Sequence, residues 1–160
     1  MASDFPAYVA RGIESTVGVE MVPGTGSGEP FVPGSFVTCS TGESSEVELC
    51  GTDPALIAGI SEVNSTYAAT ITPNGRVPIR LITNPNTVVG MCSATTPAST
   101  HVGVAYGISK LSSGNWSVLT SETTSTKVRV RVVGVDEAKG IFFCVLNPAA
   151  LQFGLSIATA

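Results

Sequence analysis

Residues 127–147 read KVRVRVVGVDEAKGIFFCVLN, and this stretch predicts a β-hairpin. Its first part alternates basic side chains with valines, which are Val128, Val130 and Val132. A period of two is typical of a strand with one buried and one solvated face. Residues 136–140 are polar or small, and Gly140 readily adopts a positive φ, so we expect the chain to reverse there.

The second half of this hairpin, residues 141–146, is apolar at every position. Such a strand needs cover on both faces, from the core on one side and from another layer or subunit on the other. Pro148 has no N–H to donate, and it favours extended geometry at Asn147. We therefore expect the strand to end at residue 147.

The composition indicates a protein that buries apolar surface against other proteins. The chain has 160 residues, enough for one domain with a sizeable core. Only 12% of its residues are charged, against about 25% in typical proteins, and its mean hydropathy is +0.35. The excess of apolar residues favours protein–protein contacts.

Several function classes are disfavoured by simple sequence features. No run of about 18 apolar residues is present, and the N-terminal residues lack the basic and apolar regions of a signal peptide. The formal net charge is −4, and the few basic residues are mostly scattered. We therefore expect neither a membrane nor a nucleic acid as a partner.

The chain divides into three parts by composition. Residues 1–33 contain two short β-prone pieces and a Gly/Pro-rich linker at residues 23–30, and we interpret them as an extended N-terminal arm. Residues 34–147 form the body, and residues 148–160 form a short C-terminal tail with apolar residues at period two. We count roughly ten short strands and no evident internal repeat. This pattern predicts an all-β protein, a compact antiparallel β-barrel or sandwich.

Individual turns and strands inside the body are also predicted. Asn74-Gly75 is a strong hairpin signal between strands at residues 67–71 and 77–82. Pro78 restricts the second of these to a sheet edge or to its first residues. Residues 55–61 have a helix-like start, but a central glycine and a β-branched end favour a strand.

The four cysteines are Cys39, Cys50, Cys92 and Cys144, and they form no C-x-x-C pair. Without a secretory signal we expect buried, reduced thiols. A bridge between Cys39 and Cys50 is the alternative. Their spacing does not support a metal site.

The sequence contains no convincing catalytic group of residues, so we expect a protein that is not an enzyme and has no cofactor, metal or catalytic site. The single histidine, His101, follows a loop of small residues and is read as a surface or capping residue rather than a general base. Glu46 and Glu48 share one strand face, which is normally a solvated face rather than a cation site. A hydrolase is the least favoured class.

Three basic residues, Lys127, Arg129 and Arg131, share one face of the predicted strand. Such a row protects a sheet edge from aggregation, or it meets an acidic surface of a partner. Trp116 and Tyr106 offer a different alternative, a stacking platform for carbohydrate, although a lone Trp at a strand start is usually part of the core.

Several segments together resemble the decoration, or cement, proteins of tailed-bacteriophage capsids. They are DPALIAGI at 53–60, the strand at 102–108 ending in Tyr106-Gly107-Ile108, SGNWSV at 113–118, TKVRV at 126–130 and GIFFCV at 140–145. The likeness covers about residues 50–147. It implies a compact β-barrel or sandwich that sits outside the phage head, spans neighbouring major capsid proteins and oligomerises on local symmetry axes.

We therefore expect a structural protein that stabilises a capsid, with the major capsid protein as its partner and a homo-oligomer, a trimer or dimer, on the shell. It would be made in the host cytoplasm and reside on the outer capsid surface of the virion. The alternative is a carbohydrate- or surface-binding β module. The expected partner-binding residues are Tyr8, Val9, Phe31, Lys127, Arg129, Arg131, Phe153 and Leu155.

Overall fold

The computed structural model describes residues 5–11, 16–23, 31–39, 46–51, 53–62 and 77–153, and this part of the chain is built from strands. The all-β prediction is confirmed. The strands are β1 (Tyr8–Arg11), β2 (Thr16–Pro23), β3 (Phe36–Cys39), β4 (Glu46–Leu49), β5 (Gly59–Ser61), β6 (Val77–Ile82), β7 (Val88–Ser93), β8 (Ala105–Lys110), β9 (Trp116–Leu119), β10 (Val130–Asp136) and β11 (Ile141–Leu146). Two short 3-10 turns, η2 (Ser99–His101) and η3 (Pro148–Ala150), accompany them.

The first barrel is closed by five strands in the order β2-β4-β3-β5-β6. The β2–β4 pair is parallel and the other four pairs are antiparallel. Alternate residues of its strands point inward and form an apolar core, as a period of two requires. This core comprises Phe31, Val37, Cys39, Val47, Ala58, Val77 and Ile79.

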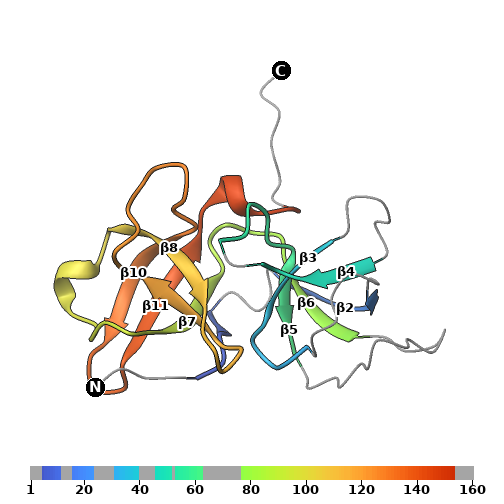
Figure 1. The fold of residues 1–160 in the computed structure, drawn as a ribbon, viewed down its shortest axis with the longest axis horizontal. Coiled ribbons are helices and arrows are strands. Elements are labelled where there is room, and N and C mark those ends of the chain that lie inside the picture. Colours follow the sequence, from blue (N-terminus) through green and yellow to red (C-terminus); the bar gives the residue numbers. More distant parts are fainter. Residues whose placement is uncertain are drawn as a thin grey trace.

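The second barrel is formed by β7-β11-β10-β8-β9, because β7 pairs with β9 in parallel and so closes the sheet. Strand β1 adds to the outside of this ring, antiparallel to the first half of β7. In Figure 1 the two barrels lie side by side, with β7, β8, β10 and β11 grouped on the left and β2 to β6 on the right. The sequence predicted one body, whereas the structure divides it into two rings.

The two barrels have the same strand order, the same directions and the same register. In each, the first strand pairs in parallel with the third at residues 22–23 and 92–93, and the remaining pairs follow the same antiparallel sequence. Equivalent ladders run through Val37, Gly59 and Leu81 in the first barrel and through Tyr106, Val130 and Leu146 in the second. The fold is therefore an internal duplication. The sequence does not reveal it because most equivalent residues differ.

Besides the core of the first barrel, the two barrels share a second apolar cluster, which is also the core of the second barrel. Phe36 of β3 meets Trp116 of β9 edge to face, with ring centroids 5.4 Å apart. Ile57 and Ile82 of the first barrel join the same cluster as Met91 of the second. Because adjacent residues of a strand face opposite sides, β3 contributes to both barrels.

The predicted hairpin is present as β10 and β11. Gly140 has φ +69° at its turn, and the burial of β11 alternates along the strand, with Phe142 buried and Phe143 partly covered. The ordered strand starts at Val130 rather than at Lys127. The backbone N–H groups of Lys127 and Val128 instead both donate to the carbonyl of Thr124, which makes a turn there.

The predicted boundary at residue 33 does not separate an arm from a body. Strands β1 and β2 are extended, but β1 pairs with β7 of the second barrel and β2 pairs with β6 and β4 of the first. Their β-branched and aromatic residues find ladder partners, which an isolated arm lacks. The N-terminal residues thus supply one strand to each half of the molecule.

Other local predictions have mixed outcomes. Pro78 is the second residue of β6, so it lies among the first residues of the strand, as expected. Within residues 55–61 only Gly59–Ser61 form a strand, and Ile57 makes an isolated bridge to Leu151. The Asn74-Gly75 hairpin, the strand at 67–71, most of the 23–30 linker and the tail beyond residue 153 lie outside the described residues.

Candidate assembly surface

Strand β1 brings two of the predicted partner-binding residues to the surface. Tyr8 is 40% exposed, and its ring lies over Gly90 of β7, where any Cβ would collide with it. Phe5 packs beside this ring at 6.1 Å. Val9 is partly buried and packs against the cluster that the barrels share. Tyr8 therefore faces outward, while Val9 attaches β1 to the second barrel.

A groove of about 320 Å³ lies between β1 and the first barrel. Pro6, Tyr8 and Pro33 are among its apolar lining residues, and Glu62 and Arg80 are its charged lining residues. The guanidinium of Arg80 is paired with the Glu62 carboxylate, with Nη2 and Oε1 separated by 2.6 Å. The groove thus combines an aromatic wall with a neutral ion pair.

The structure does not bring Phe31 to this surface. Its side chain is 1% exposed and belongs to the core of the first barrel. The Gly/Pro-rich surroundings suggested an exposed arm residue, but closure of the barrel buries it. Phe31 is therefore a core residue, and its prediction as a partner contact is wrong.

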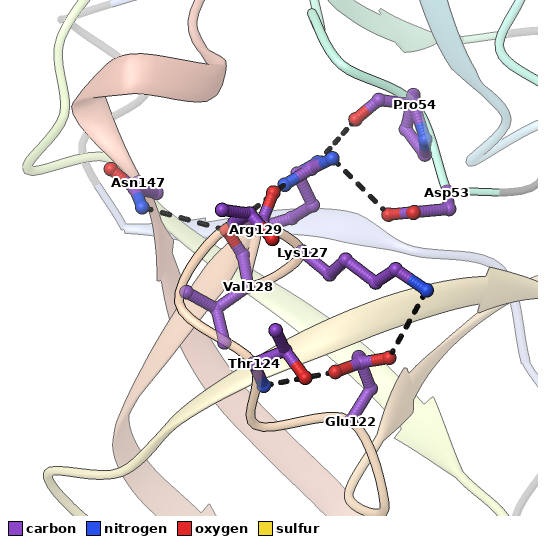
Figure 2. Close-up of polar contacts among 9 residues, drawn as sticks. Asp53, Pro54, Glu122, Thr124, Lys127, Val128, Arg129 and Asn147 are labelled. Carbon is purple, nitrogen blue, oxygen red and sulfur yellow. Dashed lines mark hydrogen bonds and ion pairs between the residues drawn. The ribbon is translucent and has the colours of Figure 1, made fainter.

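Arg129 joins the two barrels instead of facing a partner (Figure 2). Its guanidinium pairs with the carboxylate of Asp53 at 3.3 Å and donates to the carbonyls of Pro54 and, at 2.9 Å, Thr126. The side chain is only 12% exposed. Asp53 and Pro54 lie in the loop between β4 and β5, whereas Arg129 ends the equivalent loop between β9 and β10.

Lys127 is exposed and pairs with a carboxylate on the same surface. Its ammonium lies 3.8 Å from the carboxylate of Glu122, and 56% of its side chain is exposed. Hydrogen bonds from Thr124, and to a smaller extent the nearby Lys127, lower the pKa of Glu122. A surface pair of this kind contributes little to stability. Because the side chain is exposed, the ammonium is accessible to a partner.

Arg131 is exposed and donates from Nη1 to the carbonyl of Gly103 at 3.0 Å. Lys127, Arg129 and Arg131 consequently have three different environments and do not form one row. The alternation in the sequence placed them on one face, but the strand starts only at Val130, so the row does not extend to Lys127.

The C-terminal residues are partly described. Phe153 is 39% exposed, and Leu155 lies outside the described residues. Gln152 attaches this end to the first barrel, because its amide accepts from the backbone N–H of Cys39 at 2.7 Å and donates to the carbonyl of the same residue at 3.1 Å. Gln152 thus holds the residue before Phe153 beside β3.

Apolar side chains that the sequence did not single out are also exposed. Val17 on β2 is 49% exposed and Val133 on β10 is 45% exposed. Val133 lies where the β10–β11 register shifts, between Val132 and Gly134. A bulge changes the direction of the side chain of its extra residue. In the sequence, the bulge corresponds to Val-Val-Gly at 132–134.

The stacking platform suggested for carbohydrate does not exist on the surface. Trp116 is 1% exposed and Tyr106 is 6% exposed. The hydroxyl of Tyr106 is hydrogen-bonded to Nδ1 of His101 at 2.8 Å, and the His101 ring packs on Phe142. His101 is thus a partly buried packing residue, which differs from the surface residue that was expected.

All four cysteines are free and buried, as predicted, and Cys39 and Cys50 form no bridge. Burial raises the pKa of Cys50 to about 12 and also raises the pKa values of Cys39 and Cys144. A thiol with a raised pKa is a poor nucleophile at neutral pH. These residues therefore behave as small apolar side chains.

Within the described ranges, no group of three or more His, Cys, Asp or Glu side chains is arranged to hold a metal ion. The same part of the chain contains no helix with the length and apolarity needed to cross a membrane. A scan of protein-family models and searches of curated proteins and solved structures found no match to this chain.

Proposed function

We propose that this chain is a structural protein that binds the outside of a tailed-phage capsid and stabilises the shell by bridging neighbouring major capsid proteins. The observation that carries the proposal is the exposure of apolar side chains on strands of both barrels, at Tyr8, Val17 and Val133. Exposed apolar residues in a chain with only 12% charged residues favour burial against a protein partner. The resemblance of residues 50–147 to decoration proteins supports the same function.

The joining of the two barrels also supports a bridging role. Phe36 and Trp116 pack together, and Arg129 connects the loops of both halves. A body held together in this way keeps its exposed apolar residues at fixed separations. It can therefore bind two neighbouring subunits without the loss of conformational entropy that ordering a flexible linker would require.

The proposal includes the partners and the location. The major capsid protein is the partner, the chain forms a trimer or dimer on the shell, and it resides on the outer capsid surface after synthesis in the host cytoplasm. It carries out no catalysis. The carbohydrate-binding alternative has lost its main support, because Trp116 and Tyr106 are buried.

The test is to heat DNA-filled capsids that lack the protein, with and without added protein, and to record the temperature of DNA release. Protein that binds only the intact shell stabilises it by about 1.4 kcal/mol for each tenfold excess over its dissociation constant. We therefore expect release at a higher temperature. An unchanged release temperature at full occupancy excludes the stabilising role.

Two variants sharpen this experiment. Val17→Glu places a charge on an exposed apolar position and is expected to weaken binding to the capsid. Lys139→Ala is the matched control, because this side chain is 74% exposed in the β10–β11 turn, outside the apolar positions. Equal capsid binding by both variants would contradict the apolar contact at Val17.

A further inference from the structure

The duplication reveals an edge of the first barrel that is occupied in the second. In the second barrel, β9 pairs with β7 only at residues 92–93, and β1 pairs with the first half of the same strand through Val88, Val89 and Gly90. Strand β1 therefore fills the space along β7 that β9 leaves uncovered.

The described residues of the first barrel show the same arrangement without an added strand. Strand β4 pairs with β2 only at residues 22–23, and β6 pairs with the other edge of β2 from Thr16 to Met21. The residues equivalent to 88–90 are 18–20, and among the described residues no strand pairs with them on the β4 side. We call this the open edge. An uncovered strand edge presents N–H and C=O groups that can pair with another chain.

We propose that the open edge at residues 18–20 binds the C-terminal segment 154–160 of a neighbouring copy as an added antiparallel strand. The segment reads GLSIATA and has no proline and no charge. Its Leu155 and Ile157 alternate with small residues, as a strand with one apolar face requires. Strand β1 and the residue before it alternate in the same way in the occupied position, with Ala7 buried, Tyr8 exposed and Val9 partly buried. Strand addition gains main-chain hydrogen bonds along the whole segment.

The direction of the chain indicates that the segment comes from another copy. Leu151 bridges Ile57 in parallel, and the pairings around the barrel make the β5 direction the same as that of β2. By analogy with β1, the added strand runs opposite to β2. The tail of the same molecule would therefore have to reverse its direction before it could pair.

The proposal can be tested with one introduced cysteine in each of two differently labelled chains, because the four native cysteines are buried. Gly18→Cys is suitable because a Cβ there meets no atom within 4 Å. Isotopically heavy Gly18→Cys protein is mixed with light Ile157→Cys protein under mild oxidation, and heavy–light disulfides are measured by mass spectrometry. The matched control is Gly51→Cys, which is equally unobstructed but lies in the loop after β4.

We expect heavy–light bridges with Gly18→Cys in clear excess over Gly51→Cys, by about tenfold or more. Deletion of 154–160 should convert the oligomer of the full chain to a monomer in analytical ultracentrifugation, while the circular dichroism spectrum is retained. Equal bridging by both cysteines, a full-length chain that stays monomeric, or a concentration-independent bridge within one Gly18→Cys/Ile157→Cys chain overturns the proposal. None of these outcomes depends on binding to a capsid.

Discussion

At the scale of single residues, Arg129 joins two loops that lie far apart in the sequence. One guanidinium pairs with Asp53 and donates to carbonyls on two loops. An arginine suits this position because its planar group donates in several fixed directions. The ion pair between the β4–β5 and β9–β10 loops therefore depends on one arginine, which the sequence presented as one of three equivalent charges.

Replacing this side chain tests that role. Arg129→Ala removes charge-assisted hydrogen bonds from a mostly buried group, and we expect a loss of about 1.5–3 kcal/mol in the free energy of unfolding measured with urea. Arg129→Lys keeps the charge but loses the forked geometry, so we expect an intermediate loss. Lys127→Ala is the control and should change stability by less than about 0.5 kcal/mol. Similar losses for Arg129→Ala and Lys127→Ala would show that the contact between the loops is unimportant.

At the scale of elements, β11 was predicted to have two different faces, and its burial alternates along the strand. Phe142 is fully buried against the shared cluster, whereas Phe143 is partly covered and lies near Gly134 of β10. The two faces of this apolar strand therefore have different environments. One face forms part of the barrel core, and the other is only partly covered by the same chain.

Alanine substitutions separate these two faces. Phe142→Ala should cost about 3–5 kcal/mol in the free energy of unfolding, because it leaves a cavity in a packed core. Phe143→Ala should cost about 1 kcal/mol and should reduce assembly instead. Denaturant titration measures the first effect, and co-sedimentation with capsids measures the second. Equal losses of stability, with no change in assembly, would place both rings inside one subunit.

At the scale of the whole molecule, the two barrels should unfold together. Phe36 and Trp116 come from different barrels and belong to one apolar cluster, so separating the barrels exposes both rings. The chain has a single Trp, and its fluorescence therefore reports on this contact. We expect the urea midpoints of Trp116 fluorescence and of far-ultraviolet circular dichroism to coincide. A fluorescence change at clearly lower urea than the loss of strand signal would mean that the barrels separate before they unfold.

Much of the local structure follows from the sequence. The alternation of valines with polar residues, the glycine at position 140 and the proline at position 148 were enough to locate the β10–β11 hairpin and its end. The spacing of turn signals predicted an all-β chain, and the isolated cysteines predicted free, buried thiols. These are properties of neighbouring residues, because period, turn preference and backbone donors act over a few positions.

Only the tertiary structure decided how these strands combine. Whether Tyr8 and Phe31 belong to an arm depends on ladder partners that lie far along the chain, and pairing between distant strands leaves no local signal. The same is true of the duplication, because Val37 and Tyr106 occupy equivalent positions with different side chains. A barrel constrains the register and the inward face of each strand but accepts many apolar residues there. The sequence thus determined the approximate position of most of the described strands, whereas long-range packing determined the two barrels, the contacts of Arg129 and the open edge of β2.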